Sequence, residues 1–160
     1  MAQAQGHLGA ALVELAGAKS DLTYIDLGLK HMDLALEVNT RNEVPLTWAV
    51  SQLNRAVPLM VLAHARNDLV GLNKAREAIE SALTEFSERK TPFYWVSAQT
   101  DFAIVEMVIA MRTNDRILIN RGEARAKDAR LIAIRHGYGA VIISLNSVIE
   151  KISKAKKLLN

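Results

Sequence analysis

The residues that could do chemistry in this sequence are its histidines, its serines and a few glycine-containing segments. The four histidines never stand three or four residues apart, the spacing at which one helix face offers two ligands to a metal ion; they are His7, His31, His64 and His136. Gly71-Leu72-Asn73-Lys74 lacks the remainder of a phosphate-binding loop, and no serine stands in a nucleophile elbow. His136-Gly137-Tyr138-Gly139 has the composition of a loop rather than of a catalytic motif. The sequence therefore predicts a protein without enzymatic activity, metal or cofactor.

The composition favours a chain built of packed α-helices. Of the 160 residues, 50% are hydrophobic but only 5% are aromatic, so alanine, leucine, valine and isoleucine supply most of the apolar side chains. The absence of cysteine excludes disulfides and thiolate metal sites. A charge-free run of 13 residues, Gly137 to Ile149, is shorter than the roughly 20 that span a bilayer, and the N-terminus lacks the pattern of a signal peptide. We expect a cytoplasmic protein with no membrane segment.

One stretch of the sequence recurs after 47 residues. Pro45-Leu46-Thr47-Trp48-Ala49-Val50-Ser51-Gln52 is followed at this distance by Pro92-Phe93-Tyr94-Trp95-Val96-Ser97-Ala98-Gln99, which keeps the Pro, the Trp and the final Gln. The same step back from Gln52 reaches Gln5. Small residues recur at this interval too, where they would let two helices approach closely; they are Gly28, Ala75 and Gly122.

Apolar residues at helical spacing predict seven helices with short connections. We expect these helices to cover residues 2–16, 22–40, 46–65, 69–88, 93–111, 116–135 and 140–159. Gly17 should end the first helix, Pro45 should begin the third, and Pro58 should kink or split it. The predicted fold is an all-α solenoid in a single domain of residues 1–160. Its three helix pairs are repeats of residues 1–44, 45–91 and 92–137, and residues 138–160 form a C-terminal capping helix.

The repeats resemble tetratricopeptide repeats, in an extended bacterial variant. Ala35 through Gln52 is similar to the pattern Ala-Leu-Glu-Val-x-Thr-Arg-x-x-x-Pro-Leu-x-Trp-Ala-x-x-Gln of that variant, and Ala82 through Gln99 matches it loosely. Gln5-Gly6-His7-Leu8-Gly9-Ala10-Ala11-Leu12 resembles the signature of a first helix. The usual repeat has about 34 residues, so a longer unit implies longer helices. The resemblance implies a right-handed α-solenoid that acts as a scaffold or adaptor.

The resemblance also implies that a partner protein or peptide binds along the concave surface formed by the first helices of the repeats. The residues carried over to that surface are Val50, Leu53, Asn54, Val57, Met60, Val61, Ser97, Thr100, Asp101, Ile104, Met107 and Val108, with Ala10, Val13 and Glu14 from the first repeat. This lining is apolar, and its methionines suit an adaptable groove for an amphipathic helix. The C-terminal helix or a second subunit could fill the same surface, so partner capture and self-association both stay open.

The recurring Trp and Gln residues are expected to have architectural roles. Trp48 and Trp95 each follow a proline at a helix start and would pack between adjacent repeats. Gln5, Gln52 and Gln99 would place an amide in the cleft between helices, where it can bond backbone groups. The first repeat has no Pro-x-x-Trp before it. We therefore expect either a fragment of a longer repeat protein or an end that another subunit covers in a homo-oligomer.

A helical protein that binds nucleic acid is the alternative prediction. The net charge of +3 divides into −2 for residues 1–80 and +5 for residues 81–160. The basic residues of the third repeat and the C-terminal helix are Arg112, Arg116, Arg121, Arg125, Lys127, Arg130, Arg135, Lys151, Lys154, Lys156 and Lys157. Acidic residues interleave with them in pairs such as Glu123–Lys127, and no aromatic platform accompanies the arginines in the sequence. These features favour a protein partner over nucleic acid.

Overall fold

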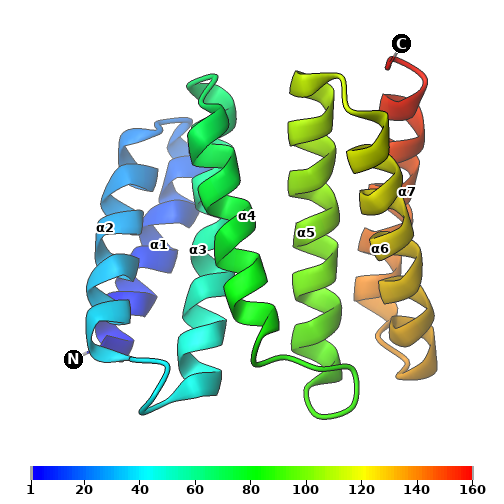
Figure 1. The fold of residues 1–160 in the computed structure, drawn as a ribbon. Coiled ribbons are helices and arrows are strands. Elements are labelled where there is room, and N and C mark those ends of the chain that lie inside the picture. The colour runs from blue at the N-terminus through cyan, green and yellow to red at the C-terminus, as the bar shows by residue number, and fades with distance from the viewer. Residues whose placement is uncertain (1, 160) are drawn as a thin grey trace. The chain divides into compact units, whose positions relative to one another are not determined.

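The computed structural model describes residues 2–159, and these residues form seven α-helices without strands (Figure 1). The helices are α1 (Ala2–Lys19), α2 (Thr23–Val38), α3 (Pro45–Ala65), α4 (Leu69–Leu83), α5 (Pro92–Thr113), α6 (Arg116–Arg135) and α7 (Gly139–Lys156). The chain forms two compact units that divide between Glu85 and Phe86, where the sequence predicted one domain. The N-terminal unit contains α1 to α4, and the C-terminal unit contains α5 to α7. The predicted all-α class is confirmed.

Helix pairs dominate the packing inside each unit. In the N-terminal unit α1 packs against α2 and α3 against α4, and α2 also contacts α3. In the C-terminal unit α5 packs against α6, and α7 contacts both. No helix within residues 2–159 combines the length and the apolar character needed to cross a bilayer.

Several helix boundaries, and the predicted effect of Pro58, differ from the prediction. Gly17 does not end α1, which continues to Lys19, because one glycine lowers helix stability by only about 1 kcal/mol. Pro58 does not split α3, since its buried ring lies within one continuous helix that runs to Ala65. The end of α4 lies at Leu83, before the predicted Glu88, and the chain then turns toward the next helix.

The connection inside each predicted helix pair uses the same turn. Ser20, Asn67 and Asn114 adopt left-handed φ angles of 53°, 56° and 53°, and each stands 47 residues after the previous one. The next residue is always an aspartate whose backbone N–H donates to an alanine carbonyl five residues earlier: Asp21 to Ala16, Asp68 to Ala63 and Asp115 to Ala110. A left-handed residue just after a helix with such a backward hydrogen bond is the Schellman type of C-terminal cap. The turn therefore repeats with the period found in the sequence.

Two of these three aspartates accept hydrogen bonds from the backbone at the start of the following helix. The Asp21 carboxylate accepts from the Thr23 backbone N–H at 2.9 Å, which holds the pKa of Asp21 below its usual value. The Asp115 carboxylate accepts from the N–H groups of Ile117 and Leu118, both at 2.9 Å. Each carboxylate satisfies backbone donors that a helix start leaves without partners.

The small residues at 47-residue spacing lie where two helix backbones come close. A Cβ atom on Gly28 of α2 would stand 2.8 Å from the carbonyl oxygen of Gly9 in α1, and one on Gly122 of α6 would stand 3.1 Å from that of Ala103 in α5. Gly9 and Ala103 are themselves two periods apart, with Ala56 between them. Ala75, the corresponding residue of α4, is fully buried. The predicted close approach is confirmed in α1–α2 and in α5–α6.

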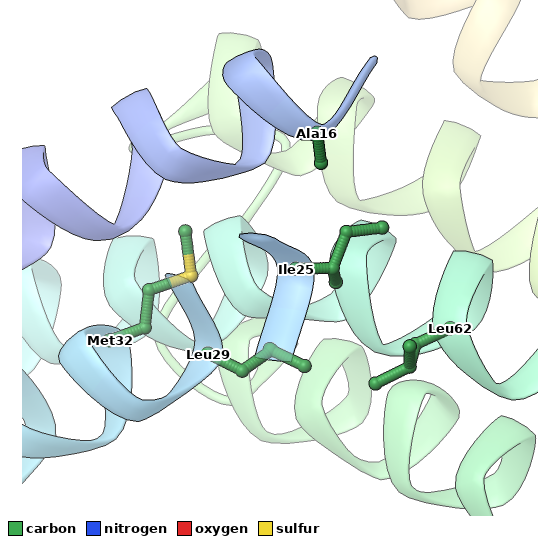
Figure 2. Packing of buried hydrophobic residues seen from close by; sticks show 5 residues of the cluster. All are labelled: Ala16, Ile25, Leu29, Met32 and Leu62. Carbon is green, nitrogen blue, oxygen red and sulfur yellow. The ribbon is translucent and has the colours of Figure 1, made fainter. Parts of the chain in front are cut away.

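The core of the N-terminal unit shows how an apolar stripe closes such a pair. Ile25, Leu29 and Met32 of α2 follow helical spacing and point toward α1 and α3. They pack with Ala16 of α1 and Leu62 of α3 (Figure 2). Each large side chain of this kind contributes about 1.5–3 kcal/mol when it is withdrawn from water.

The C-terminal unit contains a buried charge in its core. The Glu106 side chain of α5 is 0% exposed and accepts from Arg121 Nε at 2.6 Å and from Arg125 Nε at 3.0 Å. Arg125 also donates to Gln99 at 3.1 Å and lies 4.0 Å from the centre of the Phe102 ring. A buried carboxylate is tolerated only with such partners, so this network ties α5 to α6.

The close approach of α1 and α2 generates a test with an internal control. We expect Gly28→Ala to lower the free energy of unfolding of the N-terminal unit by about 1–3 kcal/mol, because the new methyl group meets Gly9 and Val13 at under 3 Å. In Gly17→Ala the new methyl group meets nothing within 4 Å, so this substitution should raise the free energy of unfolding by about 0.5–1 kcal/mol. Urea unfolding in a Trp95→Phe background, where Trp48 alone reports on this unit, measures both changes. Equal effects of the two substitutions would show that the helices do not approach closely at Gly28.

Candidate functional site

A cleft in the N-terminal unit is the first candidate site. It has a volume of about 230 Å³ and lies among α1, α2 and α3. Its lining, called here the N-terminal cleft, consists of Gln3, Gly6, His7, Ala10, Met32, Ala35, Asn39, Thr47, Val50, Ser51 and Asn54. Small and apolar side chains share this lining with amide, hydroxyl and imidazole groups.

Several polar groups of the N-terminal cleft are without partners in the chain. Within residues 2–159, the side chains of Gln3, His7, Asn39 and Asn54 make no hydrogen bond to the protein. Ser51 already donates its hydroxyl hydrogen to the carbonyl of Thr47 at 3.0 Å. An amide side chain can both donate and accept, as a peptide backbone does. The cleft therefore offers uncharged groups that match the hydrogen-bonding pattern of a polypeptide.

A second cleft lies in the C-terminal unit between α5 and α7. It has a volume of about 290 Å³, and its lining, called here the C-terminal cleft, consists of Ser97, Thr100, Asp101, Ala140, Val141 and Ser144. The predicted capping helix α7 thus covers part of the surface assigned to partner binding in the third repeat, and a cavity remains beneath it.

The two clefts occupy equivalent positions in the repeat. Gln3, Gly6 and His7 on α1 stand 94 residues, or two periods, before Ser97, Thr100 and Asp101 on α5. On the opposite wall, Thr47 and Val50 of α3 stand the same distance before Val141 and Ser144 of α7. Each unit therefore forms a cleft at the same place, between one first helix and the next, and fills it with different side chains.

Asp101 is the one charged residue in the lining of the C-terminal cleft. Its carboxyl group has no ion-pair or hydrogen-bond partner among the described residues. Burial without a partner raises the pKa of Asp101 from 3.8 to about 7, because the charged form loses hydration. The equivalent residue of the N-terminal cleft is His7, so the two clefts differ in charge at one matching position.

The predicted partner-binding residues divide into three groups. Ala10, Val50 and Asn54 line the N-terminal cleft, and Ser97, Thr100 and Asp101 line the C-terminal cleft. Leu53 is only 7% exposed and belongs to the core, whereas it was expected on the surface. The remaining residues lie outside both clefts, with Glu14, Val57 and Val61 exposed and Val13, Met60, Ile104, Met107 and Val108 half-buried.

The recurring Gln residues bond side chains rather than the backbone groups expected for them. Gln5 is hydrogen-bonded to His31 at 2.6 Å, and Gln99 to Arg125 at 3.1 Å. These pairs are equivalent, since His31 and Arg125 stand two periods apart. The residue between them is Ala78, and Gln52 pairs instead with Arg55 of its own helix at 3.4 Å.

The two Trp residues have similar backbones and different neighbours. Both are half-buried. The backbone N–H of each donates to the carbonyl oxygen of the residue four positions earlier at 2.9 Å. The Arg41 guanidinium lies 5.5 Å from the ring centre of Trp48. The residue equivalent to Arg41 in the next repeat is Glu88, so Trp95 has no matching cation.

An aromatic cluster in the C-terminal unit is absent from the sequence prediction. Phe93 contacts Tyr94 and Tyr138 at ring distances of 5.9 and 5.5 Å, and Tyr138 stacks on His136 at 5.5 Å. Phe93 and Tyr94 are 49% and 42% exposed. Next to His136, a cavity of about 490 Å³ is lined by Glu88, Arg89 and Arg135. Aromatic rings do accompany arginines here, because the fold brings together the starts of α5 and α7.

The buried carboxyl of Asp101 makes a pH-dependent contribution to stability. Its folded pKa of about 7 lies above the ordinary 3.8, so the folded chain keeps a proton that the unfolded chain loses between these values. The contribution of Asp101 to the free energy of unfolding should therefore fall as the pH rises from about 4 to about 7 and stay constant above that.

We expect Asp101→Asn to stabilise the C-terminal unit by about 1–4 kcal/mol at pH 8 and by much less at pH 5. Urea unfolding at both pH values in a Trp48→Phe background, followed through Trp95, measures the difference. Asp128→Asn on the exposed side of α6 is the matched control and should change neither value. A gain from Asp101→Asn that is the same at pH 5 and pH 8 would contradict the assignment.

Comparisons of the chain with models of known protein families, with curated proteins and with solved structures find no match. Sequence similarity therefore assigns neither a family nor a function to this chain. The likeness to tetratricopeptide repeats depends on the residues at 47-residue spacing, and the two clefts are the features whose chemistry bears on function.

Proposed function

We propose that the chain is a right-handed α-solenoid similar to tetratricopeptide repeats and that it works as a non-catalytic scaffold. Its partner is an extended peptide segment of another protein, which lies in the N-terminal cleft. The repeated turn, the repeated close approach and the repeated cleft support the solenoid assignment. A repeating array that presents the same cleft more than once is suited to binding a linear ligand.

The observation that carries this proposal is the set of unpaired amides in the N-terminal cleft. The side-chain amides of Asn39 and Asn54 make no hydrogen bond within the described residues, and apolar Met32 and Val50 lie in the same lining. Amides that donate and accept hold a peptide backbone whatever its side chains are, while the apolar lining receives one of those side chains. The lining contains no Asp, Glu, Lys or Arg, so charge attraction does not dominate binding there.

A display selection with a peptide library tests the proposal. Random dodecapeptides would be selected on the purified chain and their affinities measured by fluorescence anisotropy. We expect Asn39→Ala combined with Asn54→Ala to weaken the selected peptides by roughly 30-fold, since two hydrogen bonds of about 1 kcal/mol each are lost. Asn120→Ala on the exposed side of α6 is the matched control and should have no effect. Failure to enrich any peptide, or equal binding by the double variant, would reject the cleft as a peptide site.

Light scattering on the free chain separates peptide capture from self-association. A monomer leaves the N-terminal cleft open to a partner. A dimer that dissociates in the Asn39→Ala, Asn54→Ala variant would mean that a second copy of the chain is the occupant.

Binding of single-stranded nucleic acid is the second candidate function, and the aromatic cluster is the observation that favours it. Phe93, Tyr94 and Tyr138 offer partly exposed rings close to Arg89 and Arg135. Bases stack on such rings while arginines neutralise phosphates. Arg135 is already paired with Glu88 at 2.5 Å, which reduces the positive charge that phosphates would meet.

Anisotropy of a labelled uridine dodecamer tests this second function. If it holds, binding at 50 mM salt should weaken steeply by 200 mM. Phe93→Leu with Tyr138→Leu, which keep apolar bulk but remove the ring faces, should cost at least tenfold, as base stacking contributes about 1–3 kcal/mol per base. No binding at 50 mM salt, or binding that ignores the loss of both rings, would exclude it.

A further inference from the structure

The C-terminal cleft offers more hydrogen-bond acceptors than donors, and the Ser144 hydroxyl can act as either. Thr100 donates its hydroxyl hydrogen to the Val96 carbonyl at 2.8 Å, and Ser97 donates to the Phe93 carbonyl at 3.0 Å. Both hydroxyl hydrogens are therefore engaged inside α5, and only oxygen lone pairs remain for a ligand. The Asp101 carboxylate adds two more acceptor oxygens.

No positive charge in the lining balances Asp101. The other five lining residues are two serines, a threonine, an alanine and a valine. The basic residues near the end of α7 are not among them, and Lys154 and Lys156 are already paired with Glu150 and Glu123. An unpaired carboxylate in a partly buried cavity is unfavourable unless a cation reaches it.

We propose that the C-terminal cleft binds an organic cation, an alkylammonium or alkylguanidinium group, which pairs with Asp101 and donates to Ser97 and Thr100. An ammonium group has three N–H donors and a guanidinium has five, and neither has an acceptor. These donors complement the Asp101 carboxylate and the oxygen lone pairs of Ser97 and Thr100. The C-terminal cleft lies in a different unit from the N-terminal cleft, so this proposal stands apart from peptide binding there.

The size of the cavity limits the ligand. The volume of about 290 Å³ leaves room for a small organic group. This suits a charged head group with a short alkyl stem, and Val141 and Ala140 provide an apolar wall for the stem. Both a free amine and the Lys or Arg side chain of a partner protein have this chemistry.

A titration followed by amide NMR tests the site directly. The probes are n-butylammonium and n-butylguanidinium chlorides, with butyramide as the neutral probe, at pH 8 and moderate salt. We expect saturable shifts of the amides of residues 97–101 and 140–144 with Kd of about 1–10 mM, the strength of a single ion pair with a few hydrogen bonds. Butyramide should cause no comparable shifts.

Two variants decide whether Asp101 is responsible. Asp101→Asn keeps the shape of the side chain and removes its charge, and we expect it to weaken both cations at least tenfold. Asp128→Asn removes an exposed carboxylate of the same unit and should leave binding unchanged. Absence of saturable shifts up to 50 mM, equal binding by Asp101→Asn, or equal binding of butyramide would each overturn the proposal.

A further binding experiment, with peptides, identifies the source of the cation. N-acetyl-Gly-Lys-Gly-amide would be compared with the same peptide carrying Met in place of Lys. Asp101-dependent binding of the lysine peptide supports a basic side chain of a partner protein as the natural ligand. Asp101-dependent binding of the free cations without the peptide supports a small amine.

Discussion

The close approach of two helix backbones, in α1–α2 and in α5–α6, is the constraint on which the rest of this structure depends. Gly28 faces the Gly9 carbonyl and Gly122 faces the Ala103 carbonyl, and neither position has room for a larger residue without movement. A short turn joins the two helices of each pair, and it is built from a left-handed residue followed by an aspartate. The period of 47 residues is thus maintained at two points of every pair, the turn and the crossing. The faces of the first helices that bear no such constraint are free to vary, and these faces form the clefts.

The unusual charged residues of the chain stand at positions where one repeat differs from the others. Glu106 takes a position that is Leu12 in the first repeat and Leu59 in the second, and its partner Arg125 takes the positions of His31 and Ala78. A single charge placed among those leucines would be unfavourable, but the carboxylate and two arginines arrive together and satisfy one another. Asp101 breaks the repeat alone. It replaces His7 and Asn54, gains no partner among the described residues, and so has an unsatisfied charge that a structural role does not explain.

The sequence predicted those features that repeat and missed those that arise from contacts between distant residues. Helix identity, the turns at Asp21 and Asp115, and the close approach at Gly28 and Gly122 follow from local pattern and period. The aromatic cluster could not be found this way, since Phe93 and Tyr138 meet only because the starts of two helices lie side by side. The N-terminal cleft was predicted in part, through Ala10, Val50 and Asn54, whereas Gln3 and Asn39 were not among the predicted binding residues. The equivalence of Gln3 with Ser97 and of His7 with Asp101 was present in the period and would have indicated both clefts.

Under the two proposals, equivalent clefts on a recurring backbone bind different ligands without a change of fold. At matching positions, the N-terminal cleft has Gln3 and His7, while the C-terminal cleft has Ser97, whose hydroxyl hydrogen is already engaged, and the carboxyl group of Asp101. These residue differences between the clefts do not affect the helix crossing or the turn, because the crossing and the turn depend on other faces of the same helices. Selectivity for an uncharged polypeptide in one cleft and for a cation in the other then requires only a few side chains on a shared backbone. The reason to propose a ligand there is the cleft itself, in which the Asp101 carboxyl group faces hydroxyl oxygens and no cationic side chain; a cation that pairs with the carboxylate also removes the penalty that burial imposes.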